Sequence, residues 1–236
     1  ACKKRFPVHF GISDFRLFPP NIVGYMNQEE DLRLAAELFD LCERLSFEEL
    51  VRIRTDRISS GLNHALQDLW VRFRLESLVK AKNLALWIQK QAFFSPNYED
   101  KMSLGLDIGC GEGMGVGALL EVAHAAMGID VLISELVLAK KFLETYYHGR
   151  SYLLVAGVAE HLPLSNDIFS MVTARDVIEH VKNQERFMRE TYRVMNRKGF
   201  FFTNTQSRFV WIEPHILLPG IGYLPRFLQP PCVRLL

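Results

Sequence analysis

The chain has few cysteines, no long apolar run and almost no net charge. Four of its 236 residues are cysteines, and their spacing fits neither a disulfide framework nor a metal site. No stretch of about 18 apolar residues occurs, so the sequence offers no membrane-spanning helix. A net charge of +1 argues against a surface built for nucleic acid. Internal repeats and low-complexity tracts are also lacking.

The composition is that of a folded protein. Apolar residues make up 49% of the chain and charged residues 23%, so a sizeable core is expected. The length suits one large domain, or one domain with an attached helical part. Because the cysteines are unpaired and no signal peptide is recognised, the sequence predicts a reducing, cytoplasmic setting.

The most informative segment covers residues 104–113, where an apolar strand with Asp107 near its end runs into a glycine-rich turn. Gly109, Gly111 and Gly113 can reach backbone angles closed to other residues. Without a Cβ they also let a nucleoside-sized ligand lie against the main chain. The turn therefore predicts a nucleotide-type site, with a tight turn that binds no ligand as the alternative.

Two cofactor classes compete for this turn. A dinucleotide site needs the pattern Gly-x-Gly-x-x-Gly, but the glycines here are at positions 109, 111, 113 and 115. The third glycine therefore falls one place early or one place late. The Asp107 carboxylate would also repel a neighbouring diphosphate, whereas it would attract an ammonium group. Both points favour S-adenosylmethionine over NAD.

Further apolar segments alternate with helical ones along the chain. The expected strands cover residues 128–131, 152–156, 168–174 and 200–204. Asp130 ends the first of these strands, where a carboxylate can accept both hydroxyls of a ribose. A helix is expected to open at residues 176–181 and to end at Gly199. This alternation predicts an α/β fold with a Rossmann-like, doubly wound parallel sheet.

Five motifs, in this order and spacing, resemble class I S-adenosylmethionine-dependent methyltransferases over about residues 103–206: LDIGCGEG, GID, AEHLPL, DVIEHV and RVMNRKGFFF. The likeness is to the small-molecule group that includes ubiquinone and menaquinone biosynthesis enzymes. It implies S-adenosyl-L-methionine as the cofactor and a small-molecule acceptor, with lipid-linked and glycan-linked acceptors among the candidates.

The resemblance also implies roles for particular residues. The methionine part of the cofactor would contact the glycine turn, and the ribose would contact the end of the next strand. The adenine would contact the following loop, and the end of the fourth strand would form the floor of the site. The residues concerned are, in that order, Asp107, Gly109, Cys110 and Gly111; Asp130 and Val131; Val158, Ala159 and Glu160; and Arg175 with Asp176.

One position departs from the family pattern. Val158 is where the family usually has an acid that hydrogen-bonds the adenine amino group. Losing such a hydrogen bond costs about 1–3 kcal/mol, so cofactor binding is expected to be weaker but not abolished. Glu160 would replace the acid only if the loop shifted.

Residues 1–100 form a different region, expected to be a helical extension ahead of a cofactor domain at residues 101–236. A helix is expected over residues 28–45, a capping box at residues 46–49 opens a second, and a long helical pattern, broken once, covers residues 61–94. The extension could form a substrate lid, a packing layer or a dimer surface. The sequence does not define the oligomeric state.

The end of the chain differs from a complete sheet of this family, which closes with an antiparallel pair of strands. Residues 207–236 contain no convincing pair and several prolines, which a central strand would reject. The last strands are therefore expected to be missing. Residues 211–225 are apolar and aromatic, which favours a substrate-covering or packing loop, with peripheral membrane contact as the alternative.

The predicted chemistry follows from the cofactor, whose sulfonium methyl group is already activated. The enzyme has to hold the acceptor in line and exclude water, and a base helps only where the acceptor must lose a proton. His180 and His215 are the candidate catalytic residues, with helix packing and a backbone-bonded loop histidine as their respective alternatives. Two other functions stay open: a non-catalytic S-adenosylmethionine-binding subunit and a nicotinamide-dependent oxidoreductase.

Overall fold

The computed structural model describes residues 5–16, 26–59, 64–93, 103–205, 207, 212–213, 218–225 and 227. The chain divides into two compact units, Ala1–Thr203 and Asn204–Leu236.

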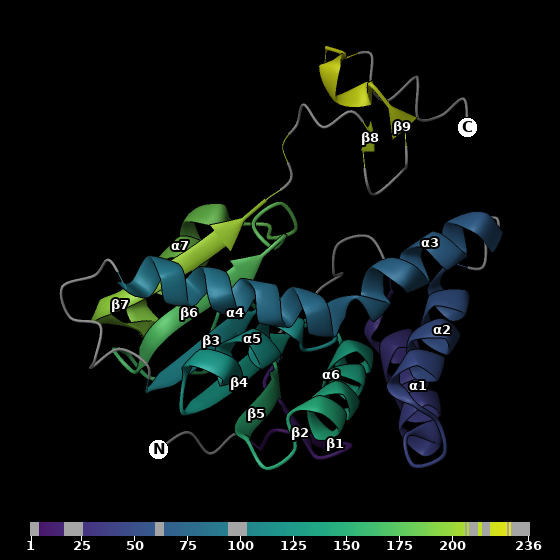
Figure 1. Cartoon of the computed structure of the whole chain (residues 1–236), viewed down its shortest axis with the longest axis horizontal. Coiled ribbons are helices and arrows are strands. Elements are labelled where there is room, and N and C mark those ends of the chain that lie inside the picture. The colour runs from purple at the N-terminus through teal and green to yellow at the C-terminus, as the bar shows by residue number, and fades with distance from the viewer. Residues whose placement is uncertain are drawn as a thin grey trace. The chain divides into compact units, whose positions relative to one another are not determined.

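A seven-stranded sheet forms the centre of the first unit (Figure 1), with the strand order β1-β2-β5-β4-β3-β6-β7. The five strands β2, β5, β4, β3 and β6 run parallel to one another in that order, and β1 runs antiparallel to its neighbour β2. The predicted Rossmann-like α/β fold is confirmed. The strands are β1 Val8–His9, β2 Ile12–Asp14, β3 Leu104–Ile108, β4 Ala125–Asp130, β5 Ser151–Ala156, β6 Phe169–Arg175 and β7 Met195–Asn204.

The strands β3 to β7 cover the five segments that the sequence predicts as strands. β1 and β2 were not predicted, because two or three residues are too few to show a period of two. Ser13 of β2 pairs with Val155 of β5, and Asp14 pairs with Ala156. The N-terminal region therefore contributes strands as well as helices to the fold.

Hydrophobic cores lie on both faces of the sheet. Leu106 and Ile108 of β3 belong to the core that contains Phe187 of α7 (Gln184–Val194). The opposite core contains residues of α5 (Met114–Val122) and α6 (Ile133–Tyr146). Since successive side chains of a strand point to opposite faces, Asp107 points toward the α5 side.

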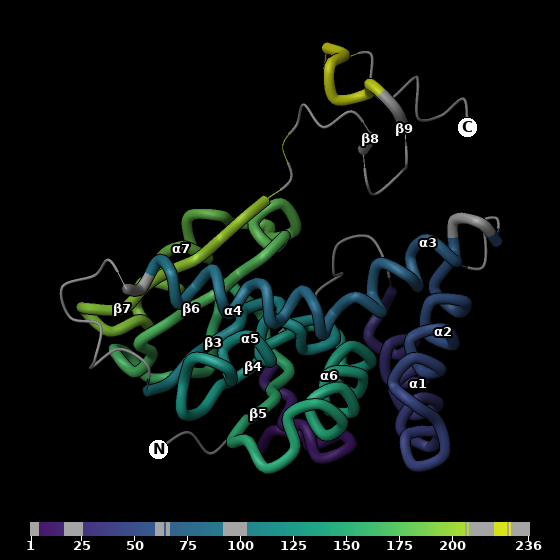
Figure 2. The backbone as a smooth tube through the Cα atoms, viewed as in Figure 1, coloured from purple at the N-terminus to yellow at the C-terminus, as the bar shows by residue number. Residues whose placement is uncertain are grey.

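The described part of the N-terminal region also contains helices α1 to α4, whose path can be followed in Figure 2. They are α1 Gln28–Leu41, α2 Phe47–Ile58, α3 His64–Leu75 and α4 Ser77–Phe93. The predicted capping box of Ser46 and Glu49 is present, and Asn27 and Glu30 form a second one at the start of α1. The long helical pattern is broken once, as expected, at Glu76 between α3 and α4.

These helices share a core with the sheet domain. Leu38 of α1, Leu50 of α2 and Ile88 of α4 are fully buried in the cluster that also contains the inner residues of α5 and α6. Figure 1 shows α4 lying beside α5 across the front of the sheet. The helical region is thus integral to the core of the first unit.

The helix predicted to open at residues 176–181 begins later. Residues 176–183 form turns and irregular structure, and α7 begins at Gln184, where the side chain of Asn183 accepts a hydrogen bond from the backbone N–H of Arg186. The predicted helix end was also wrong. The helix stops at Val194 and β7 begins at once, so Gly199 lies inside a strand.

The second unit contains a short antiparallel pair, β8 (Ile212–Glu213) and β9 (Leu218–Pro219), and a 3-10 turn over Ile221–Tyr223. The expectation that no strand pair follows residue 207 was therefore wrong. A two-residue ladder tolerates Pro219 because few hydrogen bonds depend on its missing N–H. The pair forms a sheet of its own. Among the described strands, β1 and β2 bring the main sheet to seven.

No helix in the described part of the chain has both the length and the hydropathy needed to cross a bilayer.

Candidate functional site

The glycine turn after β3 contains one glycine that packing requires and another that lies beside open space. Gly109, Gly111 and Gly113 all have positive φ, at 69°, 49° and 90°. A Cβ on Gly109 would lie 2.4 Å from Cγ2 of Val177, whereas no atom lies within 4 Å of a Cβ built on Gly111. Gly109 is thus required by packing. Gly111 borders open space of the kind that a ligand fills.

Asp130 lies directly beside this turn, at the carboxyl end of β4. The backbone N–H of Gly111 donates to Oδ2 of Asp130 at 2.8 Å, and the N–H of Leu132 donates to Oδ1 at 2.9 Å. Each oxygen keeps a lone pair that could accept a ribose hydroxyl. Burial and the nearby Glu135 carboxylate raise the pKa of Asp130 to about 6, against the lowering effect of the backbone donors.

Asp107 is buried one strand away, on the α5 face of the sheet. The hydroxyl of Thr173 donates to its Oδ1 at 2.6 Å. Burial raises the pKa of Asp107, and the charge of Arg175 and the Thr173 hydrogen bond oppose that rise. A Cβ on Gly115 would lie 2.1 Å from Oδ2 of Asp107. The fourth glycine, which sequence reasoning weighed only as spacing, thus makes room for the carboxyl group.

Cys110 packs under the turn rather than facing it. Its side chain is buried, and its Sγ would lie 2.8 Å from a Cβ on Gly128. Burial first, then the charges of Asp130 and Asp107, raises the pKa of the thiol well above its usual value. The thiol therefore stays neutral, and its contribution to the turn is its small size.

The loop expected to border the adenine is held at both ends. Val158 and His161 form an isolated antiparallel bridge, and Ala159 packs against the core on the α7 face. Oε1 of Glu160 accepts the backbone N–H of Lys182 at 2.9 Å. In this structure the Glu160 carboxylate therefore supports the entry to α7, and the adenine role of the loop stays a prediction.

Three further predicted residues lie at or after the carboxyl ends of β4 and β6. The carbonyl of Val131 accepts a hydrogen bond from Nη1 of Arg16 at 2.9 Å. Arg175 ends β6, and its Nε is buried with no hydrogen-bond partner among the described residues. His180 is half-buried in the turn before α7, and its backbone N–H donates to the carbonyl of Val177. His215 lies outside the described residues, so its catalytic role stays a prediction.

Two arginines of the N-terminal helices reach the same edge of the sheet, which sequence reasoning did not foresee. Nη1 of Arg74 in α3 lies 2.7 Å from Oε2 of Glu112, which stands between the glycines of the turn. Nη2 of Arg54 in α2 lies 2.6 Å from Oε1 of Glu135 in the first turn of α6. No pattern within one helix could have revealed these pairs, because they join residues far apart in the sequence.

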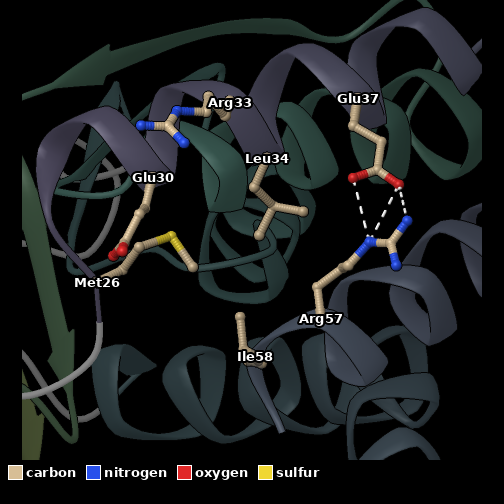
Figure 3. A pocket seen from close by; sticks show the side chains of 7 residues that line it. All are labelled: Met26, Glu30, Arg33, Leu34, Glu37, Arg57 and Ile58. Carbon is tan, nitrogen blue, oxygen red and sulfur yellow. Dashed lines mark hydrogen bonds and ion pairs between the residues drawn. The ribbon is translucent and has the colours of Figure 1, made fainter. Parts of the chain in front are cut away.

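A cavity of about 390 Å³ lies between α1 and α2 (Figure 3). Leu34 and Ile58 point into it from the two helices, and the ion pair of Glu37 and Arg57 bridges them at one end. Within the described residues no cluster of histidine, cysteine and acidic side chains could hold a metal ion. The glycine turn with Asp130 remains the strongest candidate site.

The fold and this edge site define a Rossmann-like domain with room for a nucleoside cofactor. Residues 106–203 match the protein family described as "Methyltransferase domain". Residues 106–203 therefore form a class I S-adenosylmethionine-dependent methyltransferase domain, and the cofactor of that class is S-adenosyl-L-methionine.

Known proteins similar to this chain carry related names. It is 27% identical over 151 residues to a mitochondrial ubiquinone biosynthesis O-methyltransferase of Rattus norvegicus, covering 61% of this chain and 40% of that protein. It is 33% identical over 106 residues to a probable S-adenosylmethionine-dependent methyltransferase of Mycobacterium tuberculosis, covering 45% and 36%. The solved structure of the YcgJ protein of Bacillus subtilis is 24% identical, with a TM-score of 0.45 and coverage of 51% and 49%. The chain thus spans less than half the length of the two named relatives.

Proposed function

We propose that the chain transfers a methyl group from S-adenosyl-L-methionine to a small-molecule acceptor. The observation that carries the proposal is the pairing of Asp130 with the backbone of Gly111 beside open space. A carboxylate fixed in this way is suited to two neighbouring hydroxyls of a ribose. The names of the relatives support an acceptor of the kind found among ubiquinone precursors.

The described residues fit the cofactor in three places. Asp130 would accept hydrogen bonds from the ribose hydroxyls, and Gly111 would leave room for the nucleoside against the main chain. The Asp107 carboxyl group would face the ammonium group of the cofactor. Val158, Ala159 and Glu160 are proposed to border the adenine, with Arg175 at the floor of the site.

The bound cofactor would supply a sulfonium methyl group that is already activated for transfer. The protein then has to orient the acceptor and keep water out. For a hydroxyl acceptor a base must also take the proton, and His180 and His215 are proposed for that role. His180 lies in the turn between β6 and α7, next to the carboxyl end of the sheet.

Calorimetric titration of the purified protein tests the cofactor. S-Adenosylmethionine and S-adenosylhomocysteine are expected to bind, and NADH is expected not to. Binding of NADH alone would instead support the nicotinamide-dependent oxidoreductase, against which the spacing of the glycines and the position of Asp107 speak.

Turnover separates an enzyme from a non-catalytic cofactor-binding subunit. The second function is favoured by one observation, Val158 at the position usually held by an adenine-binding acid. Methyl transfer from labelled cofactor would be measured on ubiquinone precursors, then on lipid-linked and glycan-linked hydroxyls. Tight cofactor binding with no product on any of these would favour the subunit. A cytoplasmic location and a peripheral membrane contact of residues 211–225 stay predictions.

A further inference from the structure

Four charged side chains form a continuous cluster at the glycine turn. Nη1 of Arg74 lies 2.7 Å from Oε2 of Glu112, and Nη2 lies 3.0 Å from Oε1 of Glu135. Arg54 reaches the same Oε1 at 2.6 Å. Ser77 adds a hydrogen bond of 3.0 Å from its hydroxyl to Oε1 of Glu112. Helices α2 and α3 are thereby joined to the turn and to α6.

The cluster is less exposed than the ion pair of Arg57 and Glu37 in the same helical layer, and its Arg74 and Glu112 side chains are each 18% exposed. The Arg54 side chain is 3% exposed and the Glu135 side chain 9%, whereas Arg57, paired with Glu37, is 62% exposed. Burial opposes ionisation of Glu135, but the two guanidinium groups outweigh it and lower the pKa of that carboxyl. Glu135 is therefore ionised between two guanidinium groups. Removing Arg74 would leave Glu112 without its arginine and Glu135 with Arg54 alone.

The two carboxylates flank the contact that carries the proposed ribose site. Glu112 follows Gly111 directly in the turn, and Glu135 lies in the first turn of the helix that begins just after Asp130. The backbone N–H of Gly111 and the carboxylate of Asp130 meet between them at 2.8 Å. Because nothing packs on the open side of Gly111, the position of the turn depends on support from its other neighbours.

A purely structural cluster would be expected to satisfy its own donors. Arg54 does not meet that expectation, since its Nε and Nη1 are buried with no hydrogen-bond partner among the described residues. Its guanidinium is instead kept beside Glu135 at the cost of two unpaired donors. Such a cost is more common at functional sites than in ordinary cores.

We propose that Arg74 and Arg54 are positioning residues of the cofactor site, which hold Gly111 and Asp130 in register by fixing Glu112 and Glu135. The arginines do not touch the cofactor themselves; they act through the two carboxylates. This inference rests on the proposed function, because it assumes that the turn binds S-adenosylmethionine. It assigns helices α2 and α3 a supporting part in cofactor binding.

The test is the affinity for S-adenosylhomocysteine, measured by calorimetry on the full chain with folding checked by circular dichroism. Arg74→Met should weaken binding by about tenfold or more, because it leaves both carboxylates without their shared partner. Arg74→Lys should bind with intermediate affinity, since it keeps the charge but loses the two-pronged geometry. The control Arg57→Met, which removes an exposed ion pair of the same helical layer, should change affinity by less than about twofold.

Rescue separates positioning from general loss of stability. Adding Glu112→Gln to Arg74→Met removes one uncompensated charge and should restore part of the lost affinity. A folded Arg74→Met protein that binds like the wild type would overturn the proposal. If Arg74→Met does not fold, Glu112→Gln alone decides: weaker binding in a folded protein supports the positioning role, and unchanged binding refutes it. Failure of the wild type to bind would instead refute the proposed function.

Discussion

Asp130 links the sheet, the glycine turn and the proposed ribose site through a single carboxylate. Both of its oxygens accept backbone N–H groups, from Gly111 and Leu132. The sequence predicted its position, since an acid at the end of the second strand is a local pattern. The sequence could not predict the bond to Gly111 or the influence of Glu135, which arise only when the turn and the next helix pack together.

Asp130→Ala is expected to weaken binding of S-adenosylmethionine by about 1–3 kcal/mol, because it removes the acceptor of the ribose hydroxyls. Calorimetry on the folded variant measures the change. Asp130→Asn serves as the matched control, since it keeps the shape and one acceptor oxygen and should lose less affinity. An unchanged affinity in the alanine variant would show that the ribose binds elsewhere.

The pKa of Asp130, raised to about 6 by burial and by Glu135, gives a pH dependence. Above that value the group is a carboxylate and can accept two hydroxyls; below it the proton occupies one acceptor site. Cofactor affinity should therefore fall as the pH drops from about 7.5 to about 5. Calorimetry across that range should find a flatter profile for Asp130→Asn, and identical profiles for the two proteins would contradict the assignment.

The raised pKa of Asp130 makes the stability of the fold change with pH in the direction opposite to the cofactor affinity. A carboxyl group whose pKa is raised in the folded state favours folding most where it is protonated, below its usual value of 3.8. That contribution is lost as the pH rises through the folded pKa of about 6. Burying the charged form of Asp130 thus lowers stability near neutral pH. This is consistent with a residue kept for binding rather than for the fold.

Gly111→Val should abolish measurable cofactor binding. A branched side chain would enter the open space beside the turn, and the positive φ of 49° is unfavourable for valine. Gly149→Val is the control, because Gly149 also has a positive φ and open surroundings but lies in the turn before β5. Normal binding by folded Gly111→Val would mean that the turn is only structural.

Helix α6 is capped by a residue from a distant part of the chain. The side chain of its N-cap residue, Leu132, makes no hydrogen bond to the first turn of the helix. Asp31 of α1 accepts the backbone N–H groups of Ile133 and Ser134 at 2.8 and 3.0 Å instead. The start of α6 is therefore fixed by the N-terminal helical layer, next to Val131 and the proposed ribose site.

Asp31→Ala is expected to lower the free energy of unfolding by about 2–4 kcal/mol, since it leaves two buried N–H groups and part of the Arg16 charge unpaired. Urea denaturation measures the change. The control Ser46→Ala removes an exposed N-cap and should cost about 1 kcal/mol. Equal losses in the two variants would show that burial of the Asp31 cap adds nothing.

Elements with local signals were predicted well. The capping box at Ser46, the single break in the long N-terminal helical pattern and the five strands β3 to β7 follow from periodicity and caps that lie within a few residues of one another. β1 and β2 were missed because each has only two or three residues and because β2 joins the sheet through a long-range pairing with β5. The start of α7 was misplaced because residues 176–181 look helical in sequence, but the true N-cap is Asn183.

At the scale of the whole molecule, the described cofactor-site residues all belong to the first unit, Ala1–Thr203. The second unit, Asn204–Leu236, contains the segment in which His215 was predicted to contact the acceptor. Cofactor binding and acceptor chemistry are therefore expected to be separable along the chain. The N-terminal helices are not separable in this way, because their buried residues share the core of α5 and α6.

A chain shortened to residues 1–205 should bind S-adenosylhomocysteine with the affinity of the full chain, because it keeps the glycine turn, Asp130 and the charged cluster. It should also lose methyl transfer, since the predicted acceptor segment is gone. His215→Ala in the full chain is the finer test, expected to cut turnover at saturating cofactor without changing cofactor affinity. Full turnover by the shortened chain would place the acceptor site within the first unit and leave His180 as the candidate base. Loss of cofactor binding in the shortened but folded chain would instead show that the second unit helps to form the cofactor site.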